Sequence, residues 1–352
     1  MTTLTTLAFL GDLMLGGKLN EVLPGRAPDW IWGDVLPVLQ GCDAVIANLE
    51  APVTGSGRPW RKTWKAFHYK APVAALDVLH SGKVRCVALA NNHILDYGEE
   101  GLCDTRRLLG KAGIGHAGAG PDLETAAQPA LLDLPGLRVG MISATDQMRS
   151  FRADAGTAGT HYLRFDGASP DLPALCDAAA RLRQQGCGTL VLSLHWGPNM
   201  RQRPRHRFRD FASRAIEGGF DIIHGHSAHV FQGIECHRGG IVLYDTGNAV
   251  DDYLNFWNFA GNWSFPFRHD DWSFVFLLEL RDGRPQRLRL RPICTRPWPL
   301  RLARGKEFEA IVSRMTRLSA RLGTALRRTD EGLEICCAGQ DGRTGAGSTA
   351  TD

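Results

Sequence analysis

Val84-Arg-Cys-Val-Ala-Leu-Ala-Asn-Asn-His93 is a short apolar run that ends abruptly in three polar residues. An apolar run of this length is typical of a buried strand. A helical pattern follows from Gly101 to Gly113, and a glycine just past a helix end is a usual stop signal. This stretch therefore predicts a strand, a polar loop at its carboxyl end, and then a helix.

The same unit recurs along the chain. Further strands are expected at 7–10, 44–47, 137–143, 189–194, 220–223 and 241–244, and further helices at 74–82, 172–186 and 208–219. Pro135-Gly136 and Asp282-Gly283 each separate two apolar runs, which indicates hairpins and therefore sheets of mixed direction. The alternation predicts an α/β fold in which helices cover the sheets.

Length and composition fit one main domain. The chain has 352 residues, of which 43% are hydrophobic and 22% charged, which is enough to bury a full core. The motifs described below span residues 12–248, so we expect the main domain over residues 1–300. A helical extension is expected over 301–337, with an amphipathic helix at 307–328, and the Gly/Thr/Ala-rich residues 338–352 are expected to be disordered.

The net charge and the cysteine spacing limit which partners and which cellular compartment we expect. The net charge of +4 is small for this length, which argues against a nucleic-acid-binding protein. The first apolar stretch, Leu7 to Leu15, is too short to span a bilayer and contains Gly11 and Asp12, so we expect neither a signal peptide nor a membrane anchor. The nine cysteines lack the spacing of a disulfide framework, which favours a cytoplasmic protein.

Residues able to bind metal or polarise a substrate follow several of the expected strands. They are Asp12, Glu50, Asn91-Asn92-His93, His195, His226 with His229, and Asn248. Open α/β sheets place ligand sites at the carboxyl ends of their strands. We therefore expect these side chains to share one site.

Each of these residues alone also has an ordinary structural explanation. Asp12 fits a turn, Asn91-Asn92 fits a loop that bonds its own backbone, and His195 is equally well explained as a hydrogen-bonded core histidine. His226 and His229 are more specific, because two imidazoles three residues apart in a glycine-opened loop can face one cation. The set as a whole favours a metal centre.

The donor types narrow the choice of metal. Carboxylate, amide and imidazole groups without a thiolate suit manganese, iron or zinc better than calcium or magnesium. The candidate ligands outnumber the four that a tetrahedral zinc site needs. We therefore expect two divalent ions, which can activate a water and clamp the oxygens of a substrate.

The motifs also resemble a known protein family. Their order over residues 7–253 is Gly-Asp-x-Met, Asn-Leu-Glu, Ala-Asn-Asn-His-x-x-Asp-Tyr-Gly, His-Trp-Gly, Gly-His-x-x-His-Val and Gly-Asn. This order resembles the CapA (capsule and poly-γ-glutamate synthesis) family of the calcineurin-like metallophosphatase superfamily. The run from Ala90 to Gly98 is its most specific part.

The resemblance implies a four-layer α/β/β/α sandwich with mixed sheets and a dinuclear metal centre. By position, Asp12 and His229 would bind the first ion, and Glu50 would bridge the two ions. The remaining ligands of the second ion would be Asn92, His195 and His226.

Two further residues take roles beside the ions in this resemblance. His93 would act as a general acid or hold developing charge on the substrate, and Asp96 would orient His93. A salt-bridged loop carboxylate explains Asp96 nearly as well.

Several positions depart from the family pattern. Met14 stands where the superfamily usually has a histidine, so the first ion would have fewer ligands. Pro198-Asn199-Met200 lies where a glutamate is frequent, Ser227 replaces a histidine, and His224 stands where an aliphatic residue is usual. Substrate preference is therefore expected to differ from that of the polyglutamate-capsule members.

These features predict a metal-dependent hydrolase that acts on a phosphoester or an amide-type bond of a small molecule or an anionic polymer. A link to poly-γ-glutamate or other capsule metabolism is one expectation. The alternatives are a non-catalytic accessory protein that binds an anionic polymer or an assembly partner and, less favoured, a nuclease. The basic and aromatic segment from Trp60 to Lys70 is either a lip over an anionic substrate or a solvated loop.

Overall fold

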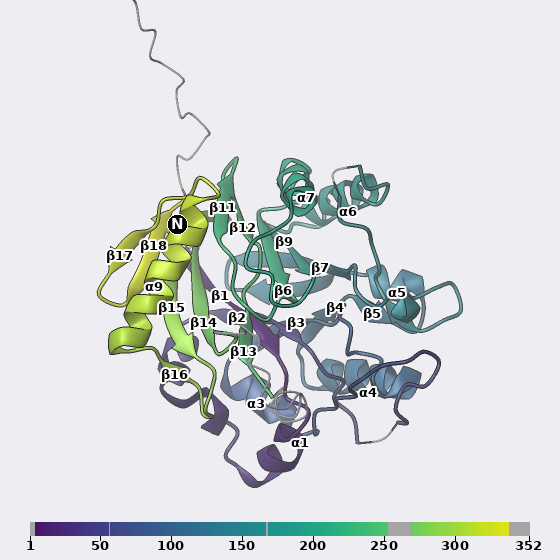
Figure 1. Ribbon diagram of the computed structural model, residues 1–352. Helices are drawn as coiled ribbons and strands as arrows, with labels where there is room; N and C mark the ends of the chain where they lie inside the picture. The colour runs from purple at the N-terminus through teal and green to yellow at the C-terminus, as the bar shows by residue number, and fades with distance from the viewer. Residues whose placement is uncertain (1–3, 56, 167, 253–268, 338–352) are drawn as a thin grey trace, which may run out of the picture.

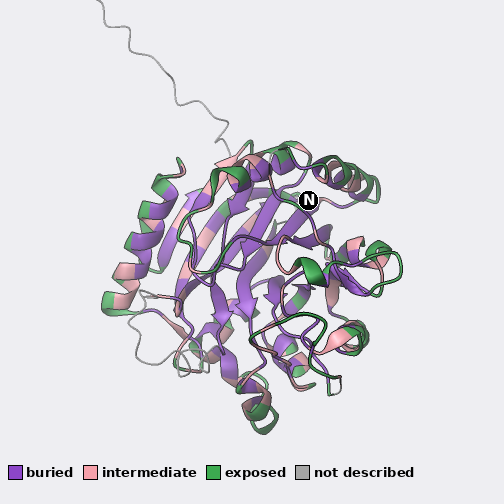
Figure 2. Ribbon diagram, turned by 45° about the vertical axis from the view of Figure 1, so that its right-hand side comes forward, coloured by how far each residue is buried: buried purple, intermediate pink, exposed green. Residues whose placement is uncertain are grey.

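Two β-sheets packed face to face carry the fold, and helices cover the outer face of each sheet (Figure 1). The computed structural model describes residues 4–55, 57–166, 168–252 and 269–337. Figure 2 shows the strands as buried and the outer sides of the helices as exposed. This arrangement confirms the expected α/β fold of four layers, with mixed sheets at its centre.

The larger sheet has ten strands within the described residues. Its main path is β17 (Arg327–Thr329), β18 (Gly332–Cys336), β15 (Arg284–Cys294), β14 (Trp272–Arg281), β1 (Leu4–Leu13), β2 (Ala44–Leu49), β3 (Val84–Ala88) and β4 (Gly115–Ala117). Off this path, β13 (Asn248–Val250) pairs with β1 and β16 (Arg301–Leu302) pairs with β15. The strands β1 to β4 are parallel, whereas β14 is antiparallel to both β1 and β15.

The smaller sheet has the order β11 (Ile234–His237), β12 (Gly240–Leu243), β10 (Ile222–His226), β9 (Thr189–His195), β7 (Leu137–Thr145) and β6 (Ala130–Leu134). Its four inner strands are parallel, and the two edge strands are antiparallel to their neighbours. The expected hairpins are present as β6–β7 and β14–β15. A separate pair is formed by β5 (Ala119–Gly120) and β8 (Gly159–Thr160).

Three apolar clusters separate the four layers. One cluster lies between the sheets and contains Phe9 of β1 and Met141 of β7. A second packs α2 (Leu36–Gln40), α3 (Ala75–Ser81) and α4 (Gly98–Lys111) on the larger sheet, and a third packs α6 (Leu172–Gln184) and α7 (His206–Glu217) on the smaller sheet. The short helices α1 (Leu19–Val22) and α5 (Leu123–Ala127) lie at the periphery.

Local sequence explains why these elements form. Helix α7 buries Phe208, Phe211, Ala212 and Ala215, the spacing that places one apolar stripe against a sheet. Strand β9 is buried at every residue, as expected for an inner parallel strand covered on both faces. Gly113 follows α4 in the left-handed region at a φ of 67°, which a glycine adopts without steric cost.

The C-terminal segment differs from the expected helical extension. Helix α9 spans Gly305–Ala320 rather than 307–328, because Gly323 turns the chain at a φ of 84° and residues 327–329 form β17. Strand β18 then pairs with β15, so residues 301–337 add strands to the larger sheet as well as a helix. The expected domain boundary at residue 300 stays a prediction, and the expected disorder of residues 338–352 lies outside the described residues.

None of the helices in the described ranges combines the length and the apolar character that a membrane-crossing segment requires.

Candidate metal centre

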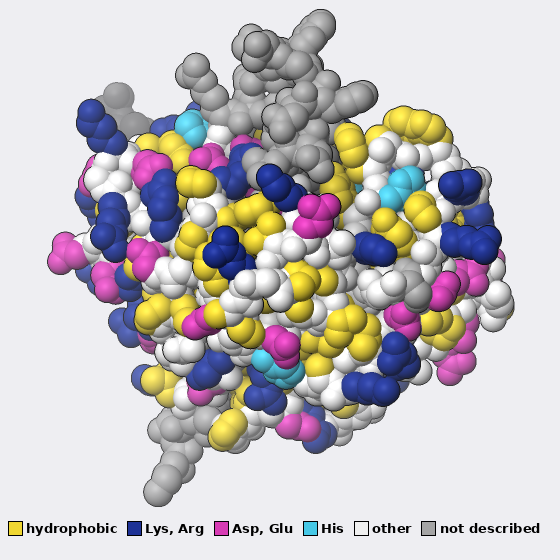
Figure 3. Space-filling view, turned by 90° about the horizontal axis from the view of Figure 1, so that it is seen from below, with side chains coloured by type: hydrophobic (Ala, Val, Ile, Leu, Met, Phe, Trp, Pro, Cys, Tyr) yellow, Lys and Arg dark blue, Asp and Glu magenta, His cyan; other side chains and the backbone are white. Residues whose placement is uncertain are grey.

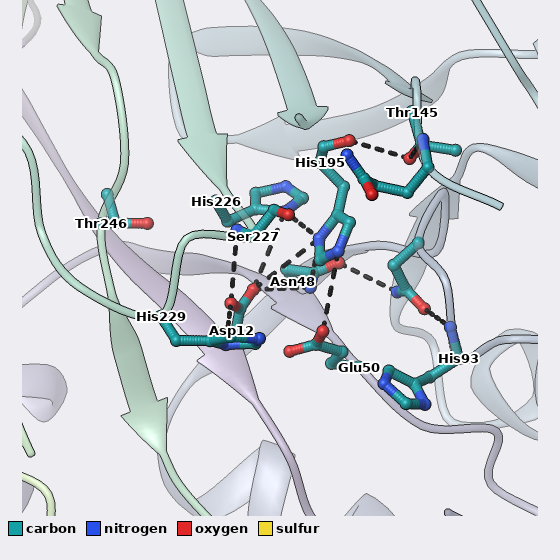
Figure 4. A network of polar contacts seen from close by, with 12 residues as sticks. Asp12, Asn48, Glu50, His93, Thr145, His195, His226, Ser227, His229 and Thr246 are labelled. Carbon is teal, nitrogen blue, oxygen red and sulfur yellow. Dashed lines mark hydrogen bonds and ion pairs between the residues drawn. The ribbon is translucent and has the colours of Figure 1, made fainter. Parts of the chain in front are cut away.

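The carboxyl ends of strands from both sheets bring five of the predicted ligands together (Figure 4). Asp12 lies near the end of β1, Glu50 directly follows β2, and His195 and His226 are the last residues of β9 and β10. His229 lies in the loop after β10. All five side chains are buried, so charge placed here is shielded little by water.

The five residues form two overlapping groups of three. Asp12, His195 and His226 make one group, and Asp12, Glu50 and His229 make the other, each with its ligand atoms within 4.8 Å of one another. Asp12 Oδ1 lies 4.0 Å from His195 Nδ1 and 3.8 Å from His226 Nδ1, while Oδ2 lies 3.3 Å from His229 Nδ1. The two oxygens of one carboxylate thus face different imidazoles.

Asp12 belongs to both groups, whereas the family resemblance gave the bridging position to Glu50. Glu50 also faces both groups, because its Oε1 lies 3.6 Å from His195 Nε2. Asn92 follows β3, and its side-chain oxygen is buried without a hydrogen-bond partner in the described part of the chain. An amide oxygen left in this state suits a metal ligand. The individual ligand roles remain predictions.

The protonation states of these groups favour a cation at the centre. Burial disfavours the charged form of His229, but Glu50 and Asp12 outweigh burial and raise its pKa to about 10. Burial lowers the pKa of His195 to about 3 and holds the pKa of His226 well below its usual range. Without a metal ion, a proton on His229 therefore offsets only one of the two carboxylate charges, and a divalent cation would displace it.

The donor set fits the implied metal ions. Three imidazoles and two carboxylates converge, and no cysteine of the described residues belongs to either group. This chemistry suits manganese, iron or zinc.

The loop between His226 and His229 has an unusual backbone. Ser227 and His229 both have positive φ values, 111° and 59°, which are uncommon outside glycine. Asp245 accepts hydrogen bonds from Ala228 N at 2.7 Å and from Gly247 N at 2.9 Å. These bonds hold the loop in the conformation that turns His229 towards Asp12.

Two asparagines organise the ligands: Asn91, which belongs to the predicted set, and Asn48, which does not. Asn48 donates to Asp12 Oδ1 at 2.8 Å, and Asn91 donates to Asn48 Oδ1 at 3.0 Å. Asn91 Oδ1 in turn accepts from the backbone N–H of His93 at 3.0 Å. Asn48 stands two residues before Glu50 in Asn-Leu-Glu, and this motif was the only sequence signal for it. Asn248, which we expected at a strand end, lies with Oδ1 3.0 Å from His229 Nδ1.

His93, Asp96 and Lys65 form a second buried group beside the ligands. His93 Nδ1 lies 2.7 Å from Asp96 Oδ2, and Lys65 Nζ lies 3.1 Å from Asp96 Oδ1 and 3.3 Å from His93 Nδ1. Asp96 therefore contacts His93 and is salt-bridged to Lys65 at the same time, and its role in orienting His93 stays a prediction. Burial lowers the pKa of His93, Asp96 opposes this shift, and Lys65 adds to it.

The segment from Trp60 to Lys70 packs against this group rather than being fully solvated. Trp60 N donates to Asp96 O at 2.9 Å, and Tyr69 N donates to Asp96 Oδ2 at 2.8 Å. Trp60 and Tyr69 are buried, whereas Trp64 is 87% exposed. The segment thus lies beside the centre with one aromatic side chain directed into solvent.

Comparison with known proteins places these motifs in a family. Residues 6–253 match the family described as "Bacterial capsule synthesis protein PGA_cap". A probable polyglutamine synthesis accessory protein of Mycobacterium tuberculosis is 30% identical over an alignment of 366 positions, gaps included, which covers 92% of this chain and 94% of that protein. The capsule biosynthesis protein CapA of Bacillus anthracis is 29% identical over 249 residues, which cover 70% of this chain and 60% of that protein.

Among solved structures, a 5′-nucleotidase precursor of Thermus thermophilus aligns with a TM-score of 0.46 at 13% identity. The alignment covers 83% of this chain and 54% of that protein.

Proposed function

Since the chain belongs to the family of bacterial capsule synthesis proteins, we propose that it is a metal-dependent hydrolase acting on a phosphoester or an amide-type bond. The observation that carries the proposal is the convergence of Asp12, Glu50, His195, His226 and His229 from both sheets on one buried point. Such a set of charged and polar side chains is costly to bury unless it serves a cation.

Two divalent ions fit this centre, and manganese, iron and zinc are the best candidates. Asp12, Glu50 and His229 would hold one ion, and His195, His226 and Asn92 would hold the other. Asp12 and Glu50 each lie close enough to both sets to bridge them. When bound, such ions supply an activated water and neutralise charge on the substrate.

His93 is the proposed proton-transfer residue. Because a carboxylate only accepts, the ring donates from Nδ1 to Asp96, which leaves Nε2 free for the substrate. Burial holds the pKa of His93 below its usual range, so the resting ring is neutral and must first gain a proton at Nε2 before it can donate to a leaving group. The Asp96 carboxylate stabilises that charged form. Lys65, on the other oxygen of Asp96, brings positive charge that favours an anionic substrate.

The proposed substrate is poly-γ-glutamate or another capsule polymer, since relatives are named for capsule and polyglutamine synthesis. The word "accessory" in the name of the mycobacterial relative supports the second candidate, a non-catalytic binder of an anionic polymer or an assembly partner. A nuclease is less favoured, because Lys and Arg alternate with acidic and apolar side chains on the face seen in Figure 3.

The test compares His229→Ala, His93→Ala and a control, His116→Ala, whose ring bonds the backbone oxygen of Ile114 outside the centre. Metal content is measured by elemental analysis, and turnover is measured on phosphoester, polyglutamate and peptide substrates. We expect His229→Ala to lose metal. His93→Ala should keep its metal and lose about 10²- to 10⁴-fold in turnover, less on nitrophenyl substrates that need little protonation.

Metal content equal to that of wild type in His229→Ala would show that His229 is not a metal ligand. A wild-type protein loaded with manganese, iron or zinc that hydrolyses nothing in the panel but binds polyglutamate would establish the accessory role instead.

A further inference from the structure

A chain of buried hydrogen bonds connects the backbone of β1 to the proposed ligand His226. His224 Nε2 lies 2.9 Å from the carbonyl oxygen of Leu10, and His224 Nδ1 lies 3.0 Å from Ser193 Oγ. The same Ser193 Oγ lies 3.0 Å from His226 Nε2. His224, His226 and Ser193 are fully buried, and Ser193 and His224 are register partners on β9 and β10.

The direction of this chain follows from its first member. A carbonyl oxygen only accepts, so His224 Nε2 carries the proton and donates to Leu10. Burial keeps the His224 ring neutral, and its Nδ1 is therefore an acceptor for the Ser193 hydroxyl. The Ser193 oxygen, having given its hydrogen to His224, accepts from His226 Nε2–H.

The consequence lies at the other nitrogen of His226. A neutral ring protonated at Nε2 has a lone pair at Nδ1, and this atom faces Asp12 Oδ1 at 3.8 Å and His195 Nδ1 at 2.9 Å (Figure 4). An imidazole binds a metal ion only through an unprotonated nitrogen. Without the Ser193 acceptor, the His226 proton would gain a partner by moving to Nδ1, where it would occupy the cation position.

We propose that Ser193 and His224 are positioning residues that hold His226 in the tautomer with a free Nδ1 and thereby set the affinity of the centre for a divalent cation. This inference rests on the metal centre of the proposed function. Partners of this kind around a metal site typically change affinity by 10- to 100-fold.

Ser193→Ala tests the inference with little change in packing, and the chain offers a matched control. Ser143 is the register partner of Ser193 on β7, is equally buried, and its hydroxyl has no hydrogen-bond partner among the residues that the structure describes. Ser143→Ala therefore removes the same atom at the same depth without touching the chain of bonds. His224→Leu is the second test variant.

Two measurements are made on the full chain. Calorimetric titration of metal-free protein with Mn²⁺ and with Zn²⁺ gives the affinity, and ¹⁵N NMR of the histidine rings reports the His226 tautomer before any metal is added. We expect Ser193→Ala and His224→Leu to bind about 10- to 100-fold more weakly, and Ser143→Ala to bind as wild type. The His226 proton should sit on Nε2 in wild type and shift towards Nδ1 in Ser193→Ala.

Unchanged affinity and an unchanged His226 tautomer in Ser193→Ala would overturn the inference, even if His224→Leu failed to fold. A wild-type protein that binds neither ion would instead overturn the proposed function, and the tautomer in metal-free protein would still decide the role of Ser193.

Discussion

Substitution of Gly11, the residue before Asp12, is expected to destabilise the protein because the fold leaves no space for a side chain there. A Cβ at this position would lie 1.7 Å from the carbonyl oxygen of Gly247 and 2.7 Å from its carbonyl carbon. Both are backbone atoms, so no side-chain rotation relieves the overlap. The same oxygen accepts from Asp12 N at 2.9 Å, where β1 pairs with β13. Gly11→Ala must therefore push β13 away from β1.

The expected cost combines two effects. Overpacking a core costs about 1 to 3 kcal/mol, and losing the hydrogen bond between Asp12 and Gly247 costs about 0.5 to 1.5 kcal/mol. The added methyl group restricts the unfolded chain, which returns about 0.4 to 1 kcal/mol. The free energy of unfolding should fall by roughly 2 kcal/mol, and displacement of Asp12 should also lower bound metal.

Gly110→Ala is the matched control. Gly110 lies within α4, a Cβ there would meet no atom within 4 Å, and alanine in a helix is favoured over glycine by about 0.5 to 1 kcal/mol. Denaturant unfolding followed by tryptophan fluorescence should therefore show opposite signs for the two variants. A Gly11→Ala protein as stable as wild type would refute the close approach of β1 and β13.

Two further predictions concern buried charges. Lys65→Met leaves the buried Asp96 carboxylate without its ammonium partner. The free energy of unfolding should fall by about 3 kcal/mol, near the low end for a broken buried pair, because His93 and Tyr69 N still contact Asp96. A loss below about 1 kcal/mol in denaturant unfolding would show that the pair is solvated. Burial raises the pKa of Asp252 from 3.8 to about 7. Between these two pH values the folded protein retains a proton that the unfolded chain has released. The contribution of Asp252 to stability is therefore fully present below about pH 4 and is lost as the pH rises to about 7. Asp252→Asn should flatten the dependence of the unfolding midpoint on pH between 4 and 8, and an unchanged slope would mean that Asp252 ionises normally.

Much of the framework could be read from local sequence. Apolar runs and glycine stops located the central strands and the helices that cover them, because burial periodicity and chain reversal depend on residues a few positions apart. The same reasoning placed Asp12, His195 and His226 at strand ends, where parallel strands present ligands on one edge. The length of α9 was misjudged, since its apolar pattern continued into residues that pair as β17.

Other features depend on contacts between residues far apart in the chain. The membership of Asp12 in both ligand groups requires β1 and β10, which come from different sheets, to meet at their ends. The bond from Asn48 to Asp12, the burial of Lys65 against Asp96, and the path from Leu10 through His224 to His226 likewise join separate elements. Local sequence determines which side chains a strand end can offer. The direction in which each amide or imidazole points is set by the partners that packing brings to it, because a buried polar group must find a hydrogen bond wherever the fold provides one.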